Sequence, residues 1–291
     1  MLSSLINSMR LRTLPLSLAG VVCGALLAWP HAEARMPLWT LVTLFLTTVS
    51  LQVLTNLSNE LGDHLSGVDG EGREGPNYSM ADGGLSVKQM WYAINWTVVA
   101  CCLFGWLMII FSFGSLLHSW KPNVLILLGA AAIWAATHYT LGKNPYGYIG
   151  LGDLFVFIFF GLVSVMGGYF VIAQTLEWHV LIPACAIGLL SVAVLNVNNI
   201  RDMASDKGLR KTIPLRIGSR AAKCYQTVLV LTGASLLFFN LPFKWWNIIL
   251  MAIMIAHVVI VWRNDGKKLD PALPILVITT FLFGLAYGLQ F

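Results

Sequence analysis

Long apolar runs alternate with short polar segments along the whole 291-residue chain. A membrane-spanning helix needs about 20 predominantly apolar residues. The chain has nine such apolar stretches, at 13–29, 37–58, 91–113, 122–142, 153–175, 178–198, 223–240, 244–262 and 271–290. The pattern predicts an all-α integral membrane protein in which residues 1–291 form a single bundle of about nine transmembrane helices.

The composition agrees with this pattern. Hydrophobic residues make up 57% of the chain and charged residues 11%, and the mean hydropathy is +0.76. An ordinary soluble domain has roughly 25% charged residues. A soluble globular protein is therefore excluded.

The distribution of basic residues predicts the orientation in the membrane. With the N-terminus in the cytoplasm, all of the 18 Lys and Arg lie on the cytoplasmic side except Arg35, Lys121 and Lys244. This asymmetry follows the positive-inside rule and predicts a multi-pass protein of the cell inner (cytoplasmic) membrane. The two long polar loops, 59–90 and 199–222, are then cytoplasmic. The net charge of +5 is mostly a topology signal, so we expect no nucleic-acid partner.

Two acidic stretches, 56–69 and 196–206, each end an apolar segment. Residues i and i+4 share one face of a helix, which predicts one row of oxygen ligands at Asn59 and Asp63 and a second at Asn198, Asp202 and Asp206. Carboxylates are costly beside hydrocarbon, and oxygen ligands together with phosphate oxygens suit Mg²⁺. The residues thus favour a membrane site for Mg²⁺ and a diphosphate. The alternative is a pair of solvated helix-capping loops.

The cations behind the second stretch fit the same hypothesis. Arg210, Lys211 and Arg216 follow it closely, and such side chains clamp phosphate oxygens. Arg220 and Lys223 are better explained by topology alone. The two stretches also align, residue 59 with 198 and 63 with 202, which indicates an internal repeat with a site between its halves. Chance similarity of two helix ends is the alternative.

Two further loops are candidates for function. The Gly-rich segment 64–84 has the length of a lid over a binding site, or else of a disordered connector. The loop from Tyr139 to Asp153 joins two spans on the predicted cytoplasmic side and carries Lys143, Tyr146 and Tyr148. Interfacial Tyr side chains often only anchor a helix in the headgroup layer.

Four stretches together resemble the UbiA superfamily of intramembrane prenyltransferases. They are 10–15, 59–69, 145–153 with 164–167, and 198–218. The third stretch is the most similar to the branch that prenylates 1,4-dihydroxy-2-naphthoate in menaquinone biosynthesis. The resemblance implies one UbiA-type domain and a Mg²⁺-dependent transferase. Its reaction would move a polyprenyl group from polyprenyl diphosphate to 1,4-dihydroxy-2-naphthoate with decarboxylation, giving demethylmenaquinol at the lipid bilayer.

The resemblance also implies roles for individual residues. The metal ligands would be Asn59, Glu60, Asp63, Asp69, Asn198, Asp202 and Asp206. The catalytic residues would be Asp63, Asp202, Arg210, Lys211 and Tyr139. Substrate contacts would come from Arg12, Asn56, Arg73, Lys143, Tyr146, Tyr148, Asp153, Arg201 and Arg216. Glu60 stands where the family usually has Asp. The 206–212 spacing is one residue shorter than the family's, which leaves open whether Arg210 or Lys211 is the main diphosphate contact.

Other functions remain as alternatives. The same chemistry on 4-hydroxybenzoate or homogentisate keeps every site residue and changes only the acceptor. CDP-alcohol phosphotransferases also use intramembrane carboxylates and Mg²⁺, but their Asp-Gly and Ala-Arg signature is missing from this sequence. A non-enzymatic transporter would need a carboxylate near the centre of a span, and the acidic residues here lie at span ends.

Overall fold

A computed structural model describes residues 2–67, 79–115, 119–240 and 244–289. Within these ranges the regular structure is helical, apart from one isolated bridge between Lys207 and Arg210. The α-helices are α1 (Leu2–Ser8), α2 (Leu14–Ala28), α3 (Pro37–Ser66), α4 (Val87–Phe113), α5 (Trp120–His138), α6 (Gly152–Val156), α7 (Ser164–Ala173), α8 (Leu181–Arg201), α9 (Ile213–Ile217), α10 (Ser219–Phe239), α11 (Trp245–Arg263) and α12 (Ala272–Gly288). Short 3₁₀ turns are η1 (Leu11–Thr13), η2 (Trp29–His31), η4 (Trp178–Val180) and η5 (Gly266–Leu269), and η3 (Phe157–Val163) is a π-helix.

The described residues contain nine helical segments long and apolar enough to cross a membrane. This confirms the predicted helical membrane bundle. The largest boundary differences are at the first span, whose helical segment begins at Leu2 instead of residue 13, and at α3, which continues to Ser66 instead of ending at residue 58. Because α3 is longer than predicted, residues 59–66 of the first acidic motif lie on a helix and not in a loop.

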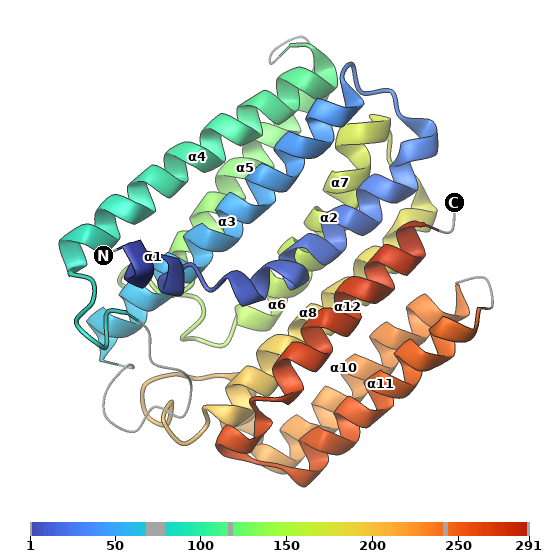
Figure 1. Ribbon diagram of the computed structural model, residues 1–291. Helices are drawn as coiled ribbons and strands as arrows, with labels where there is room; N and C mark the ends of the chain where they lie inside the picture. The colour runs from blue at the N-terminus through green and yellow to red at the C-terminus, as the bar shows by residue number, and fades with distance from the viewer. Residues whose placement is uncertain (1, 68–78, 116–118, 241–243, 290–291) are drawn as a thin grey trace.

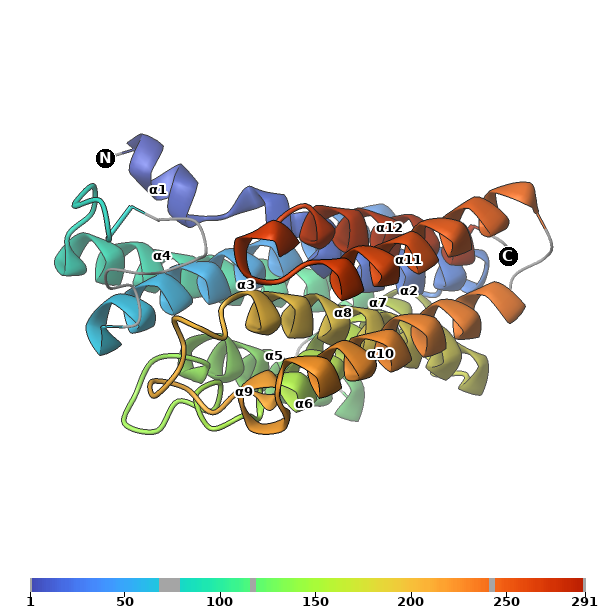
Figure 2. The same ribbon diagram turned by 90° about the horizontal axis from the view of Figure 1, so that it is seen from below.

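The helices form a bundle in which neighbours in sequence are mostly neighbours in space (Figure 1). On one flank α3 packs along α4 and α5, and on the other α10 packs along α8 and α11. Between the flanks, α2 contacts α7 and α12. Figure 2 shows α1, the C-terminal end of α3 and the loops that follow α5 and α8 at the end of the bundle opposite the chain's C-terminus. We call it the acidic end, because both acidic motifs lie there.

Small residues allow the closest helix contacts, as is common in membrane bundles. A Cβ atom on Gly161 would lie 2.5 Å from the Cα of Gly188, and one on Gly20 would lie 1.7 Å from the Ser164 hydroxyl oxygen. The π-helix that contains Gly161 and the N-terminal half of α8 therefore approach each other backbone to backbone. This packing fixes the position of α8, and with it the position of its last turn at the acidic end.

The two acidic helices end in different ways. At the end of α3, Gly67 has φ 73° and its amide donates to the carbonyls of Asp63 and His64, a left-handed cap that glycine adopts readily. In α8 the last helical residue is Arg201, and Asp202 is the cap. The expectation that Asp206 continues the ligand row on the helix was wrong, because the helix stops before it. One further bond, from the Asp206 amide to the Asp202 carbonyl (2.9 Å), still brings the chain round by a turn.

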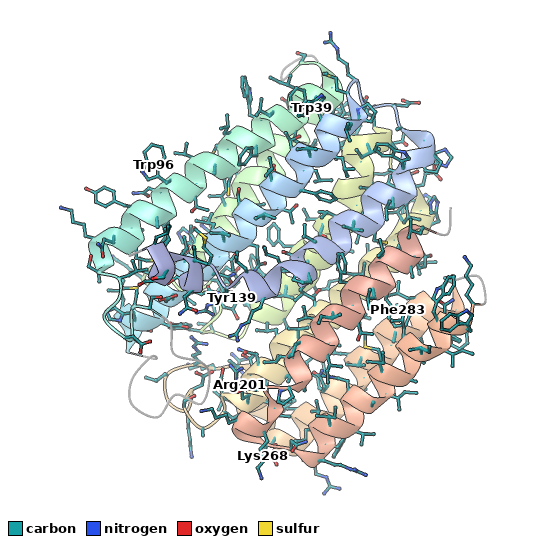
Figure 3. All side chains as sticks on the ribbon, in the orientation of Figure 1. Trp39, Trp96, Tyr139, Arg201, Lys268 and Phe283 are labelled. Atoms are coloured by element: carbon teal, nitrogen blue, oxygen red, sulfur yellow. The ribbon has the colours of Figure 1, made fainter. Side chains whose placement is uncertain are left out.

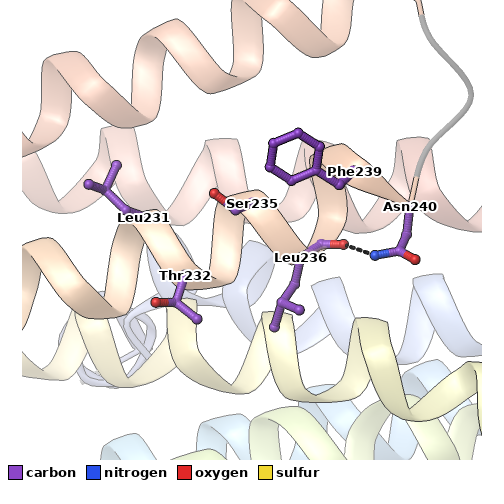
Figure 4. A pocket seen from close by; sticks show the side chains of 6 residues that line it. All are labelled: Leu231, Thr232, Ser235, Leu236, Phe239 and Asn240. Atoms are coloured by element: carbon purple, nitrogen blue, oxygen red, sulfur yellow. Dashed lines mark hydrogen bonds between the residues drawn. The ribbon is translucent and has the colours of Figure 1, made fainter.

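The outer surface is apolar and rich in exposed aromatic side chains, among them Trp39 and Trp96 (Figure 3). Such residues suit contact with lipid and with the membrane interface. One shallow hollow of about 400 Å³ lies on α10 near its C-terminal end (Figure 4), lined by Leu231, Thr232, Ser235, Leu236, Phe239 and Asn240. The Asn240 amide donates to the Leu236 carbonyl (2.8 Å). This hollow has no charged lining residue.

Candidate active site

Arg210 joins the two acidic motifs. Its guanidinium pairs with Asp63 of α3, and its Nη1 lies 3.8 Å from Oδ2 of Asp206. The three side chains are 12%, 7% and 4% exposed. Two carboxylates from segments far apart in sequence thus share one buried cation. The expectation that the motifs face one another is met at this ion pair.

Tyr148 covers this ion pair. Its hydroxyl donates to Oδ1 of Asp63 (2.9 Å) and lies 2.8 Å from the Ser66 hydroxyl. The Arg210 guanidinium carbon lies 4.8 Å from the centroid of the Tyr148 ring, within the range of a cation–π interaction. Tyr148 therefore contacts both Asp63 and Arg210. Its predicted role was substrate contact.

A backbone clamp brings Tyr148 to Arg210. The Lys211 amide donates to the Tyr148 carbonyl (2.9 Å), while Arg216 donates to the carbonyls of Ile149 (2.5 Å) and Lys211 (3.1 Å). We call these three hydrogen bonds the loop clamp. It joins the loop after α5 to the loop after α8. The guanidinium of Arg216 thus holds the loop after α5 against the loop after α8.

Next to the carboxylates lies a basic hollow of about 250 Å³, lined by Lys207, Gly208, Arg210, Lys211, Leu215 and Arg216. Four of its six lining residues are basic, so it favours an anion rich in oxygen. Arg210 lines this hollow and also contacts Asp63 and Asp206. The sequence left open whether Arg210 or Lys211 is the main diphosphate contact. Arg210 lies between the carboxylates and the hollow. Lys211 lines the hollow and takes part in the loop clamp through its backbone.

Asp202 of the second motif is paired with the residue that precedes it. Arg201 donates to both oxygens of Asp202 (2.7 Å each), to Asn198 (2.8 Å) and to Asp270 (3.0 Å). Arg201 and Tyr139 are both labelled in Figure 3. A bidentate fork of this kind fixes the direction of a carboxylate.

Aromatic residues form the wall behind the carboxylates. Tyr139 meets Tyr146 edge-on at 5.3 Å, and Tyr146 stacks on Phe155 with ring centroids 4.0 Å apart. The Tyr146 hydroxyl donates to the Ala135 carbonyl (2.8 Å). Thr140 donates to the Ser58 carbonyl (2.9 Å) and lies 3.3 Å from Oδ1 of Asn59. These contacts attach the loop after α5 to the α3 motif.

The charges at this site follow from burial and proximity. Burial raises the pKa of Tyr139 to about 12, and burial together with the charge of Asp63 raises the pKa of Tyr148 to about 12. Both phenols therefore stay protonated near neutral pH. Burial disfavours the charged form of Arg210, but the charges of Asp63 and Asp206 outweigh it and raise the pKa of that side chain.

The donor set fits a hard divalent cation. The described residues hold no cluster of three or more His, Cys, Asp or Glu side chains already at ligand spacing. Asp63 and Asp206, however, are two buried carboxylates that already share a cationic group, and carboxylate oxygens are what Mg²⁺ prefers. Glu60 is fully buried: its Oε1 accepts from the Met80 amide (2.9 Å), and its Oε2 has no hydrogen-bond partner among the described residues. Asp69 lies outside the described residues.

The other predicted contacts that the structure describes are Asn56, Arg12 and Lys143. Asn56 is buried and donates to the Met9 carbonyl (2.8 Å) and to the Thr13 hydroxyl (3.0 Å), so it connects α3 to the turn before α2. Arg12, on η1, and Lys143, in the loop after α5, are exposed. Arg73 lies outside the described residues.

Three residues of the site were not predicted from the sequence. The Tyr225 hydroxyl donates to Oδ2 of Asp153 (3.0 Å), which gives that carboxylate the partner its apolar surroundings require. Thr140 lies beside Asn59, and Asp270 pairs with Arg201. Thr140 lies in the loop from Tyr139 to Asp153, which the sequence indicated without singling out this residue. Tyr225 and Asp270 stand in no motif, so no local pattern indicated them.

The sequence profile of the UbiA prenyltransferase family matches residues 17–278. The chain belongs to this family. It is 40% identical over 241 residues to the 1,4-dihydroxy-2-naphthoate octaprenyltransferase of Escherichia coli (strain K12), covering 81% of this chain and 76% of that one. The enzyme of the same name from Haemophilus influenzae is 34% identical over 290 residues, 96% of this chain and 92% of the relative. A solved UbiA homologue from Archaeoglobus fulgidus bound to GPP and Mg²⁺ has the same fold, with a TM-score of 0.64, 18% identity and 98% of each chain covered.

Proposed function

We propose that this UbiA-family protein transfers a polyprenyl group from polyprenyl diphosphate to 1,4-dihydroxy-2-naphthoate. The observation that carries the proposal is its 40% and 34% identity to enzymes named for that acceptor. In the net reaction a C–C bond forms between the ring and C1 of the prenyl chain, while the prenyl C–O bond and the bond between the ring and its carboxylate break. Carbon dioxide and diphosphate leave, and the aromatic product is a demethylmenaquinol.

The cofactor in this proposal is Mg²⁺, and a family member of the same fold has been solved with Mg²⁺ bound. The residues that would hold it are Asp63, Asp202 and Asp206, with Asn59, Asn198, Glu60 and the undescribed Asp69. When bound, the ion supplies positive charge to the departing diphosphate. The diphosphate itself would lie in the basic hollow.

Arg210 can interact with the carboxylates and with a diphosphate in the basic hollow, because it lies between the two. With no substrate it balances the buried charges of Asp63 and Asp206, which would otherwise repel each other. When another cation neutralises those carboxylates, the guanidinium is free to pair with diphosphate oxygens in the adjoining hollow. Lys211 and Arg216 provide further positive charge around the same anion. The exchange stabilises negative charge at the leaving group, where it develops during reaction.

The aromatic wall supplies the dry surroundings that an allylic cation needs. Tyr139, Tyr146 and Phe155 present packed rings, and the Tyr139 and Tyr148 hydroxyls remain neutral donors. Exclusion of water prevents hydrolysis of a reactive cation. Segment 64–84 remains our proposed lid, and most of it lies outside the described residues. We further place the acidic end at the cytoplasmic face of the inner membrane, with the prenyl tail between helices.

The decisive experiment is an acceptor panel with the purified protein in nanodiscs. Polyprenyl diphosphate is supplied with 1,4-dihydroxy-2-naphthoate, 4-hydroxybenzoate or homogentisate, with Mg²⁺ or with EDTA, and products are identified by mass spectrometry. We expect a decarboxylated prenyl naphthalenediol from the naphthoate alone, and only with Mg²⁺. Product from another acceptor, with none from naphthoate, would refute the substrate assignment.

A further inference from the structure

Asp270 contacts the second acidic motif from the far end of the chain. It lies between η5 (Gly266–Leu269) and α12 (Ala272–Gly288), and its backbone amide donates to the Lys267 carbonyl (3.1 Å). Its Oδ1 accepts a hydrogen bond from Nη1 of Arg201 at 3.0 Å. The side chain is 40% exposed, whereas that of Arg201 is 5% exposed.

The guanidinium of Arg201 is oriented by this contact. Four of its N–H groups are used: Nε and Nη2 hold the two oxygens of Asp202, Nη2 also reaches Asn198, and Nη1 reaches Asp270. A guanidinium is a rigid plane with five donors. Acceptors on both sides therefore fix its rotation, and with it the direction of the Asp202 carboxylate.

Asp202 keeps capacity for a further ligand in this arrangement. A carboxylate has about four lone-pair sites, and Arg201 occupies one on each oxygen. Arg201 carries one positive charge and pairs with two carboxylates, Asp202 and Asp270. Arg201 therefore does not fully neutralise the negative charge of Asp202. Outer partners of this kind orient the ligands of a metal and tune their affinity.

We infer that Asp270 is a positioning residue for the metal ligand Asp202, acting through Arg201. The inference rests on the proposed function in so far as Asp202 is taken as a Mg²⁺ ligand. It assigns Asp270 no contact with substrate. It makes Arg201 the link between this carboxylate and the metal site.

The same loop offers a matched control in Asp265. Its Oδ1 lies 2.8 Å from Nζ of Lys223 and 3.4 Å from the Ser219 hydroxyl oxygen, and its side chain is 74% exposed. Asp265→Asn removes the same charge from the same connection between α11 and α12. The partners of Asp265 lie on α10, so its loss leaves the bonds of Arg201 in place.

The test is Mn²⁺ binding, followed by electron paramagnetic resonance, to the full-length protein in nanodiscs without prenyl donor or acceptor. Loss of an outer partner typically weakens metal binding about 10-fold or more, so we expect that weakening for Asp270→Asn. We expect less than about a 2-fold change for Asp265→Asn, and Asp270→Glu should recover most of the affinity. Prenyl transfer by Asp265→Asn should equal that of the wild type.

Three results would overturn the inference: wild-type Mn²⁺ affinity in Asp270→Asn, an equal loss in Asp265→Asn, or no Mn²⁺ binding by the wild type. If Asp270→Asn does not fold, Arg201→Lys replaces it, because lysine keeps the charge and loses the fork. Undiminished affinity in that variant would also overturn the inference. Since no substrate is present, failure to prenylate naphthoate would refute the proposed function without touching this result.

Discussion

The two acidic motifs look alike in sequence, but their aligned carboxylates, Asp63 and Asp202, pair with cations of different origin. Asp63 receives its counter-charge from Arg210, 147 positions further along the chain. Asp202 receives it from Arg201, the preceding residue. The α3 motif is thus completed only by tertiary structure, while the α8 motif brings its own cation.

Helix length explains part of this difference. Helix α3 continues past Asp63 to Ser66, so the carboxylate points from the side of a helix toward the loop after α8. Helix α8 ends at Arg201, and the chain turns at Asp202 before it reaches Asp206. In the described structure it is Asp206, and not Asp202, that joins Asp63 at Arg210. An apparent repeat can therefore have halves with different electrostatic roles.

The largest effect is expected from the carboxylates themselves. Asp63→Asn keeps the shape of the side chain and removes the charge that Arg210 and the proposed metal both need. We expect transfer to fall about 10³-fold, the upper range for loss of one electrostatic contact in a transition state. Initial rates in nanodiscs measure it, with size-exclusion chromatography to show that the variant is folded. Asp202→Asn should fall comparably, and near-wild-type rates in either variant would remove that residue from the site.

The next comparison sets Arg210→Gln against Arg201→Gln. Each leaves a buried carboxylate without its cation, which costs about 3 kcal/mol, so both should lower the thermal unfolding midpoint. Added Mg²⁺ should restore Arg210→Gln, because another cation can replace the guanidinium between Asp63 and Asp206. It should not restore Arg201→Gln, because Arg201 also ties α8 to Asp270.

Differential scanning fluorimetry with MgCl₂, or with NaCl at equal ionic strength, measures these midpoints. Restoration of both variants by Mg²⁺, or of neither, would show that the two motifs are neutralised in equivalent ways.

A smaller effect is expected at Tyr148. Tyr148→Phe keeps the ring over Arg210 and removes the hydrogen bond to Asp63. A hydrogen bond to a charged group is worth about 1.5–3 kcal/mol, so kcat/KM should fall about 10-fold or more. Tyr146→Phe is the matched control, because its hydroxyl bonds only to the backbone of Ala135 in the described structure. Equal losses in both variants would contradict a special role for Tyr148.

The smallest effect is expected at the loop clamp. Arg216→Lys keeps the positive charge of the hollow but cannot bond to the Ile149 and Lys211 carbonyls with one planar group. We expect KM for the diphosphate donor to rise about 5-fold with kcat nearly unchanged, since lysine loses at least one of the two bonds and such a bond is worth about 1 kcal/mol. Steady-state kinetics measures both constants. A fall in kcat alone would mean that Arg216 acts on the chemical step.

Much of the fold was predictable because membrane spans depend on local composition. The nine spans and the acidic ends of α3 and α8 follow from apolar length and from the cost of carboxylates in lipid. The boundaries were less predictable: the polar residues of 59–66 end the hydrophobic run without ending the helix. The backbone hydrogen bonds of a helix continue as long as its side chains find contacts elsewhere in the fold. Composition alone does not predict those contacts.

The site divides in the same way. The sequence by itself determined which residue types gather at the acidic end, since two carboxylate motifs, the cations behind them and the Tyr-rich loop are local patterns. Only the tertiary structure decided that Arg210 reaches across to Asp63, that Tyr148 covers the pair, and that Asp270 orients Arg201. These contacts join segments 69 to 147 positions apart. Their distances depend on how whole helices pack, and no local pattern encodes them.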